Sequence, residues 1–477
     1  MRVHLLHMND VHSRLESYMR LGQQLRALRS RLEDLGEPVL TFDIGDVLDR
    51  VRPETEATMG TLNAEMMAAL GVNGWVFGNN EGLTIPVQDW PGLVARANTS
   101  VFGTNLRQPN GDPFPFFIDT HVFDVHGVRV GAFGLTPNYD LPYEMLHVQP
   151  LDPFACARTA VKNLRSAGAH IVVCLSHLGL RDDRRLAAMV PGIDVILGGH
   201  SHESMPRAEY VEKTAIFQPG KHATAFGHTI IDWDGRSVQQ VVSKPVPVLH
   251  ETPFDMAMEQ VYRRYEEHIQ AILGRPVASL AEGLPIVYHD ESTFANLLVD
   301  VLFDEFQGDL AVMMTGALNA SLLPGTLTLE GLLAACPTPT RPIVVSLTGR
   351  ELQAAIEQGI QPETYGRLGI GFGFRGGKIG YLVIAGAVVE LVDDGERQHV
   401  RRILHQGREL EPDRTYRVIT CEYLWLAPVF QPFRAARDIT YQPPLVREVL
   451  IARIADEGRI ERAKLRRYVR VSAAKRG

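Results

Sequence analysis

Acidic, amide and imidazole side chains follow five apolar stretches within the first 202 residues of the sequence. These stretches, with the residues that end them, are LLHMNDVH, VLTFDIGD, GWVFGNN, IVVCLSH and DVILGGHSH. Carboxylate, imidazole and amide ligands without a thiolate favour Mn, Zn, Fe, Co or Mg over a structural cysteine–zinc site. A carboxylate has two oxygens, so Asp46 can bridge two cations roughly 3.5 to 4 Å apart. The candidate metal ligands are Asp10, His12, Asp46, Asn79, His177, His200 and His202.

The apolar stretches have the length and composition of buried strands, which must bring these ligands together. In open α/β sheets, functional groups gather beyond the carboxyl ends of the strands, where loops converge on a rigid frame. Amphipathic helical stretches alternate with the strands, as in an α/β domain. One helix is predicted where leucines recur at positions 21, 25, 28, 32 and 35, before a stop at Gly36. Another is predicted between a cap at Asp152 and Pro153 and a stop at Gly168.

The chain of 477 residues is too long for a single hydrophobic core. An amphipathic stretch over residues 253–274 predicts a long helix that connects two domains. Beyond it, Ser292 is predicted to cap a helix that runs through Phe306. The strand LAVMM and the strand-turn-helix segment IVVSLTGRELQAAIEQG follow. We therefore expect a first domain over residues 1–250, a connecting helix over 251–275 and a second α/β domain over 276–477.

The overall composition excludes several classes of protein. Apolar residues make up 45% and charged residues 22% of the chain, as in a protein that is folded throughout. The formal charge of -8 gives no basic field to hold a nucleic-acid polymer, so a small-molecule substrate fits better. The first apolar stretch is too short for a signal peptide or a membrane span, so we expect a cytoplasmic enzyme without a membrane partner. Nothing in the sequence predicts the oligomeric state.

The four cysteines are scattered through apolar stretches and form no CxxC pair. Buried free thiols are therefore the favoured interpretation, and two disulfides are the alternative. The cysteines are Cys156, Cys174, Cys336 and Cys421.

The ordered series D-x-H, G-D, G-N-x-E, S-H and G-G-H-S-H resembles the calcineurin-like metallophosphoesterases. The long second domain narrows the resemblance to the 5'-nucleotidase and UDP-sugar hydrolase family. Within that family, GDVLDR and FGNNEG are most similar to the bacterial branch of YunD-like metallophosphatases. The resemblance implies a four-layer αββα metallophosphoesterase domain, followed by a 5'-nucleotidase-type α/β domain that binds substrate.

The resemblance also implies a role for each candidate ligand. The first metal would be held by Asp10, His12 and His202, and the second by Asn79, His177 and His200. Asp46 would bridge the two metals, which activate a water for attack on phosphorus. A single histidine among the 17 of this chain is more often structural, and that is our interpretation of five further histidines. These are His4, His7, His121, His126 and His147.

One family motif is altered in a way that bears on catalysis. The usual G-N-H-E-F-D supplies a His–Asp dyad that assists the leaving group, whereas residues 78–83 are GNNEGL. Asn80, which we count among the catalytic residues with Asp46, can donate a hydrogen bond but supplies no proton. We therefore expect diphosphates or activated esters to be better substrates than AMP. Alternatively, His222 or Asp49 with Arg50 fills the vacancy, although a packed loop and a surface ion pair explain these residues equally well.

The second domain lacks the usual substrate-binding motifs N-G-G-x-I-R, P-F-x-N and G-G-D-G-F. The corresponding stretches are TGALNASLLPG, CPTPTRP and LWLAPVFQPF. A cation beside a stacking aromatic ring can hold a nucleobase and its phosphate, although core or surface packing is the more common role of such residues. The candidates for substrate contact are Arg341, Phe372, Phe374 and Arg375, with Phe430 and Phe433 as further stacking residues.

The resemblance thus implies metal-dependent hydrolysis of phosphate ester or diphosphate bonds in nucleotides or nucleotide sugars, as in nucleotide catabolism. The alternative is a nucleotide- or metal-binding regulatory protein with attenuated catalysis. The intact set of seven ligands favours the enzyme, whereas the missing dyad and the altered second domain favour the regulatory protein.

Overall fold

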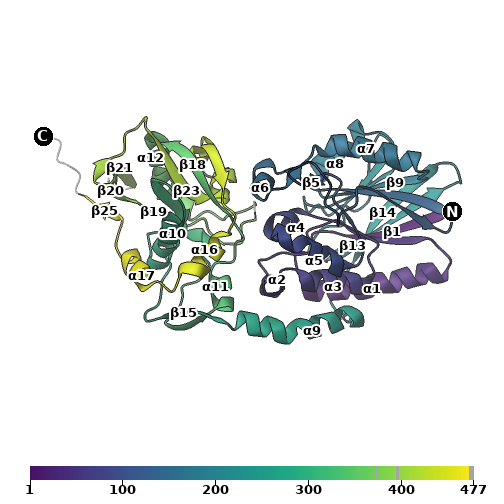
Figure 1. The fold of residues 1–477 in the computed structure, drawn as a ribbon, viewed down its shortest axis with the longest axis horizontal. Helices are drawn as coiled ribbons and strands as arrows, with labels where there is room; N and C mark the ends of the chain where they lie inside the picture. The colour runs from purple at the N-terminus through teal and green to yellow at the C-terminus, as the bar shows by residue number, and fades with distance from the viewer. Residues whose placement is uncertain (372, 394–396, 472–477) are drawn as a thin grey trace. The chain divides into compact units, whose positions relative to one another are not determined.

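The computed structural model describes residues 1–371, 373–393 and 397–471. The chain divides into two compact units, Met1–Ile269 and Gln270–Gly477. The long helix expected over residues 253–274 is α9, Met256–Leu273, and it crosses the division between the units (Figure 1).

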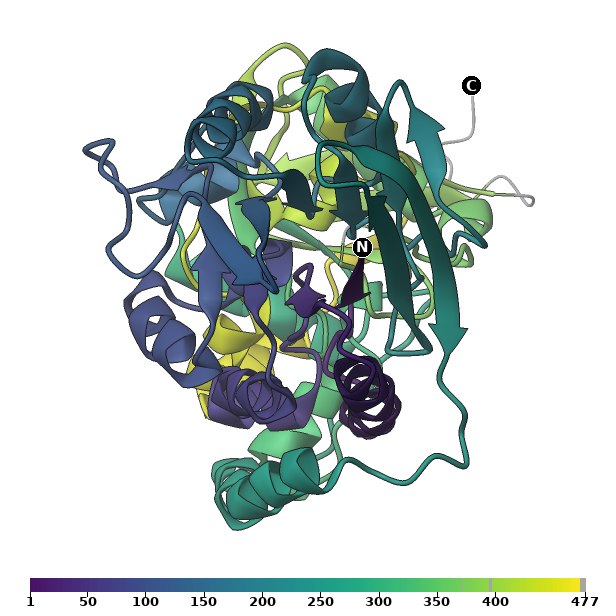
Figure 2. The same cartoon turned by 90° about the vertical axis from the view of Figure 1, so that its right-hand side faces the viewer.

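The first unit contains two six-stranded sheets, ordered β14-β13-β1-β2-β3-β4 and β11-β12-β10-β9-β7-β6. The strands β1 to β4 are mutually parallel, and so are β7, β9, β10 and β12. Figure 2 shows the purple N-terminal strand between the blue strands and the long teal strands of the first sheet. The first sheet comprises β1 Arg2–Met8, β2 Val39–Asp43, β3 Gly74–Val76, β4 Ser100–Phe102, β13 Ala225–Trp233 and β14 Val238–Pro247. The second comprises β6 His121–Val125, β7 Val128–Leu135, β9 Ile171–Ser176, β10 Val195–Gly198, β11 Glu209–Val211 and β12 Thr214–Phe217. The short strands β5 Leu106–Arg107 and β8 Gln149–Pro150 pair with each other.

The two sheets pack face to face and carry helices on their outer faces. Leu5 and Phe42 of the first sheet pack against Val173 and Leu175 of the second in one buried cluster. On the other face of the second sheet, alternate residues such as Cys174 pack against α7 and α8. In Figure 1, α7 and α8 lie on one side of the strands, and α1, α3 and α5 lie on the other. The helices and the 3-10 turn of this unit are α1 Leu15–Asp34, α2 Pro53–Thr58, α3 Thr61–Leu70, α4 Asn79–Thr84, η1 Val87–Asp89, α5 Trp90–Ala97, α6 Asp140–Met145, α7 Pro153–Ser166 and α8 Leu180–Met189. The predicted four-layer αββα architecture is confirmed.

Two helices of the first unit test predictions that were made from the sequence. Asp152 accepts hydrogen bonds from the backbone N–H groups of Phe154 and Ala155, at 3.1 and 3.2 Å, so the predicted cap of α7 is confirmed. In α1, Leu21, Leu25 and Leu32 are buried as predicted, but Leu35 is 69% exposed. The prediction for Leu35 is wrong because the helix ends at Asp34, so the helical periodicity does not extend to it.

The second unit contains a five-stranded sheet, a four-stranded sheet and a strand pair. Their orders are β19-β16-β23-β18-β24, β22-β21-β20-β25 and β15-β17. The strands are β15 Pro276–Leu280, β16 Leu310–Met314, β17 Gly325–Thr328, β18 Pro342–Thr348, β19 Leu382–Ala385, β20 Ala387–Asp393, β21 Gln398–His405, β22 Arg408–Glu409, β23 Thr415–Cys421, β24 Arg437–Tyr441 and β25 Tyr468–Arg470. Its helices and 3-10 turn are α10 Thr293–Glu305, η2 Thr315–Ala317, α11 Leu329–Ala335, α12 Gly349–Gly359, α13 Pro362–Tyr365, α14 Glu422–Leu426, α15 Gln431–Arg434, α16 Val446–Arg453 and α17 Glu457–Ala463.

The predicted side-chain cap of α10 is wrong. Ser292 occupies the cap position, but its hydroxyl makes no capping hydrogen bond and is buried without a partner among the described atoms. The helix is stabilised instead by burial of every side chain from Phe294 to Leu302. In α12, by contrast, Thr348 accepts a hydrogen bond from the Glu351 N–H, and the Glu351 carboxylate accepts one from the Thr348 N–H.

All four cysteines are free thiols; Cys174, Cys336 and Cys421 are buried, and Cys156 is half-buried. The structure therefore supports the interpretation of free thiols over disulfides. In the part of the chain that the structure describes, no helix is both long and apolar enough to cross a bilayer.

Candidate metal centre

The seven predicted ligands lie just beyond the carboxyl ends of five strands, three from the first sheet and two from the second. Asp10 and His12 follow β1, Asp46 follows β2, Asn79 follows β3, His177 follows β9, and His200 and His202 follow β10. Five of these residues have a left-handed backbone, which costs free energy for a side chain other than glycine and is enriched at functional sites. Their φ values are 49° at Asp10, 48° at His12, 52° at Asp46, 71° at His200 and 61° at His202.

The ligating atoms gather in two clusters, each with its atoms within 4.8 Å of one another. The clusters are Asp10, His12 and His202, and Asp46, His177 and His200. Asp46 faces both, since its Oδ1 lies 3.4 Å from His177 Nε2 and its Oδ2 lies 3.9 Å from His12 Nε2. One carboxylate that presents a different oxygen to each cluster has the geometry of a bridging ligand.

Buried atoms in these clusters, and one atom of Asn79, have unused hydrogen-bonding capacity. Asp10 Oδ1, Asn79 Oδ1 and His177 Nε2 are buried and have no hydrogen-bond partner among the described residues. A buried polar atom without a partner lowers the stability of the fold by about 1–3 kcal/mol, so its presence calls for an explanation. Divalent cations would use all three as ligands, and the donor types suit such cations. The residues present therefore fit two metal ions.

The carboxylates of the centre also attract positive charge. Burial lowers the pKa of His12, but the neighbouring carboxylates of Asp10 and Asp49 outweigh burial and raise the pKa to about 10. Burial likewise lowers the pKa of His177, and Asp46 outweighs it and raises the pKa to about 9. Protons and metal ions compete for the same imidazole nitrogens, so the charge that draws a proton here also draws a cation.

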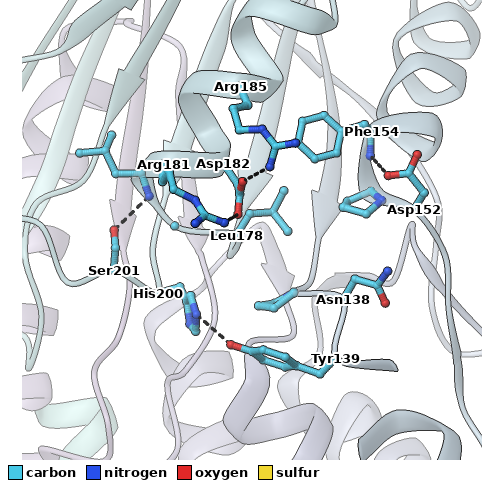
Figure 3. Close-up of a pocket in the computed structure, with 14 residues that line it drawn as sticks. Asn138, Tyr139, Asp152, Phe154, Leu178, Arg181, Asp182, Arg185, His200 and Ser201 are labelled. Atoms are coloured by element: carbon cyan, nitrogen blue, oxygen red, sulfur yellow. Dashed lines mark hydrogen bonds and ion pairs between the residues drawn. The ribbon is translucent and has the colours of Figure 1, made fainter. Parts of the chain in front are cut away.

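Groups around the ligands hold them in place. Glu81 accepts hydrogen bonds from the N–H groups of Asp46, Leu48 and Gly78 at 2.9, 3.1 and 2.8 Å, which joins two ligand loops. The Tyr139 hydroxyl lies 3.1 Å from His200 Nε2 (Figure 3). Such outer partners fix the orientation of metal ligands.

Further outer partners lie beside Asp10, His12 and His177. Asn9 donates to Asp10 Oδ2 at 2.6 Å, Asp49 Oδ2 lies 3.3 Å from His12 Nδ1, and His177 Nδ1 lies 2.6 Å from the Ile44 carbonyl. Of these outer groups, Glu81 had a sequence signal as the acidic residue of the G-N-x-E motif, and Asp49 was a candidate replacement for the missing dyad.

The residues around the missing dyad lie beside His12 or in the buried interior. The Asn80 amide nitrogen donates to the Leu48 carbonyl at 3.1 Å and lies 3.0 Å from His12 Nδ1. The His222 ring lies with its centroid 5.6 Å from that of His12, beside the first cluster. The alternative explanation of Asp49 and Arg50 as a surface ion pair is wrong, because both residues are 2% exposed. Arg50 instead forms a buried ion pair with Glu56 at 2.7 Å.

The predicted substrate contacts lie in the second unit. The Arg341 guanidinium donates to the Pro443 carbonyl, and the Phe374 ring stacks on Tyr423 at 4.7 Å between centroids. The Arg375 backbone N–H donates to Thr338 Oγ1 at 3.2 Å, which brings the loop before β18 next to the glycine-rich loop. Phe372 lies outside the described residues.

The two further stacking candidates, Phe430 and Phe433, are fully buried against each other, with ring centroids 6.2 Å apart. Their role in the structure is core packing.

A four-layer αββα domain with two carboxylate–imidazole clusters at its strand ends defines a metallophosphoesterase. Residues 3–204 match the family described as calcineurin-like phosphoesterase, and residues 277–428 match the 5'-nucleotidase C-terminal domain. The uncharacterized metallophosphoesterase YunD of Bacillus subtilis is 30% identical over 95% of this chain and 99% of its own length. The chain belongs to the calcineurin-like phosphoesterases that carry a 5'-nucleotidase C-terminal domain, and it is a metal-dependent phosphoester hydrolase.

Solved structures share the whole fold at lower identity. A 5'-nucleotidase precursor from Thermus thermophilus is 20% identical with a TM-score of 0.60, and 99% of each chain is covered. The NAD nucleotidase of Haemophilus influenzae is 14% identical with a TM-score of 0.71, over 99% of this chain and 100% of that one.

Proposed function

We propose that this enzyme hydrolyses phosphate ester or diphosphate bonds of nucleotides or nucleotide sugars at two divalent cations. Asp10, His12 and His202 hold one cation in this proposal, Asn79, His177 and His200 hold the other, and Asp46 bridges them. The observation that carries the proposal is the pair of clusters, which share Asp46 as a neighbour. Buried atoms that could bind a metal have no hydrogen-bond partner among the described residues. The 5'-nucleotidase C-terminal domain and the nucleotidases among the similar proteins support a nucleotide substrate.

Bound cations supply Lewis acidity that neutralises the phosphoryl oxygens and makes a water nucleophilic at neutral pH. The protein contributes the fixed arrangement around them. Rigid strand ends present the ligands, and Glu81 ties the loop of Asp46 to the loop of Asn79. Preorganised ligands of this kind lower the cost of reaching the transition state.

The leaving group is proposed to be a good one, as in a diphosphate, because position 80 supplies no acid. The Asn80 amide already donates to the Leu48 carbonyl, and its oxygen lies 3.3 Å from Asn79 Nδ2. General acid assistance is worth about 10²- to 10⁴-fold in rate, and a nucleoside alkoxide needs it more than a phosphate does. Substrate contact by Arg341, Phe374 and Arg375 stays a prediction, as does that by Phe372.

The native metal is proposed to be Mn, Zn, Co, Fe or Mg, which suit this donor set. A cytoplasmic location is supported by the four free cysteines. Within the described residues, no observation favours the alternative of a regulatory protein with attenuated catalysis.

The test measures phosphate release and bound metal for the wild type and Asp46→Asn, which keeps the size of the bridging residue. We expect Asp46→Asn to lose more than about 100-fold in activity, beyond the cost of outer-shell changes, and to bind less metal. Asp34→Asn, an exposed change of the same kind in α1, should match the wild type. Wild-type metal content and turnover in Asp46→Asn would overturn the assignment.

A further inference from the structure

A cavity of about 530 Å³ lies beside His200 in the first unit, within the usual volume range of small-molecule sites (Figure 3). Three segments line it together with the His200 loop. They are the loop from Pro137 to Tyr139, the start of α7 from Asp152 to Phe154, and residues 178–182 with Arg185 around the start of α8. Apart from His200, the lining residues do not belong to the metal clusters, so the cavity lies next to the centre and shares one residue with it.

One part of the cavity wall is suited to a ring. Phe154 and Leu178 are half-buried, and the Tyr139 side chain is partly exposed. The Arg185 guanidinium lies 5.0 Å from the Phe154 ring centroid, which holds that ring in place. Asn138, an exposed amide, stands beside these apolar groups. Apolar faces with a few polar groups recognise a hydroxylated ring, such as a sugar.

Another part of the wall carries two arginines and two carboxylates. The Asp182 carboxylate is shared by two guanidinium groups, Arg185 at 2.6 Å and Arg181 at 3.4 Å. The other lining carboxylate, Asp152, accepts the N–H groups that begin α7 and is therefore already engaged. Arg181 has a side chain that is 86% exposed, so it has donors to spare for an anionic ligand.

The cavity reaches the metal centre through two residues. Tyr139 lines the cavity and directs its hydroxyl toward the His200 imidazole, as Figure 3 shows. His200 lines the cavity as well and belongs to the cluster with Asp46 and His177. A substrate whose reacting phosphate lies at the clusters would pass His200 to enter the cavity.

We propose that this cavity binds the leaving-group end of the substrate, a sugar ring that carries a negative charge. The ring packs on Phe154 and Leu178, and the anionic group pairs with Arg181. Hydrolysis adds the water oxygen to phosphorus and releases a proton of that water to solvent. It breaks the bond from phosphorus to the bridging oxygen, which leaves with its electron pair as an anionic oxygen of the sugar phosphate. The inference rests on the proposed function and adds a leaving-group site in the first unit.

The first experiment compares two substrates of the manganese-loaded full chain. UDP-glucose carries a charged sugar leaving group, whereas p-nitrophenyl phosphate carries none. The ratio of their kcat/KM values should fall about tenfold in Arg181→Glu, as expected for one charge-assisted contact. The ratio should stay at the wild-type value in Arg207→Glu, the same charge change at an exposed site of the same unit. An unchanged ratio in Arg181→Glu would overturn the proposal.

The second experiment measures the binding of glucose 1-phosphate in the absence of turnover. Phenylglyoxal modifies exposed arginines, and mass spectrometry reports the rate at each position in the manganese-loaded protein. Glucose 1-phosphate should slow modification of Arg181 several-fold and leave Arg207 unaffected. Equal rates with and without glucose 1-phosphate would refute the site, and equal protection by inorganic phosphate would refute the role of the ring. Protection of Arg181 in a protein that hydrolyses neither substrate would refute the proposed function and leave the site standing.

Discussion

His7 should make the first unit labile to acid. Its ring is fully buried in β1, and both of its nitrogens lack a hydrogen-bond partner among the described residues. Burial lowers the pKa of His7 from 6.5 to about 3. The neighbouring Gly227 leaves the space for the ring, since a Cβ there would lie 2.1 Å from His7 Cε1. The folded state therefore holds this imidazole neutral.

Because of His7, the free energy of unfolding depends on pH, and the direction of that dependence follows from the lowered pKa. The pKa of the folded state lies below that of the unfolded state, so the unfolded state binds the extra proton. Stability is fully present above pH 6.5 and falls as the pH decreases toward about 3. Each pH unit between these values costs about 1.4 kcal/mol, so at pH 4.5 the loss is about 3 kcal/mol.

The substitution His7→Leu removes this titration and also the two unsatisfied nitrogens. At pH 7.5 we expect a stability within about 1.5 kcal/mol of the wild type, because the volumes are similar. At pH 4.5 the variant should gain about 3 kcal/mol relative to the wild type. Guanidinium unfolding at both pH values measures the change, and comparison at each pH cancels the other titrating groups. His250→Leu, at an exposed site, is the control, and an equal pH dependence in all three proteins would refute the reasoning.

Three further predictions concern the metal centre. Glu81→Gln puts an amide N–H against the backbone N–H groups that Glu81 now binds, so metal affinity should fall about 10- to 100-fold in an equilibrium titration. Adding manganese to metal-free protein at pH 7.5 should release about two protons, because the pKa values of His12 and His177 are raised to about 10 and about 9. Asn80→His should raise AMP hydrolysis more than p-nitrophenyl phosphate hydrolysis, and an equal change for both would count against the leaving-group argument.

The gathering of the candidate ligands could be predicted because their signal is local. Each follows an apolar strand directly, and strand ends of a parallel sheet meet at one edge whatever the rest of the chain does. The cap at Asp152 was equally local, since it depends on hydrogen bonds to residues 154 and 155. The failures at Leu35 and Ser292 were of another kind, because periodicity and residue type say nothing of where a helix ends or where a hydroxyl points.

Most contacts around the ligands could not be predicted, because they depend on segments that are distant in the sequence. Tyr139 meets His200 across 61 residues, and Asp49 meets His12 across a gap that no motif spans. Arg50 carried a charge that suggested the surface, yet it is buried with Glu56. The cavity beside His200 combines the starts of two helices and one loop, so only the folded chain reveals it.

The origin of the ligands in two different sheets has a mechanical consequence. Asp10, Asp46 and Asn79 belong to the first sheet, and His177 and His200 belong to the second. In the proposed holoenzyme, each cation therefore links one sheet to the other at the carboxyl ends of their strands. Separation of the sheets at these ends would have to break metal bonds before it exposed the core. Amide hydrogen exchange at the ends of β1 and β9 should slow together when metal is added, since the same links hold both.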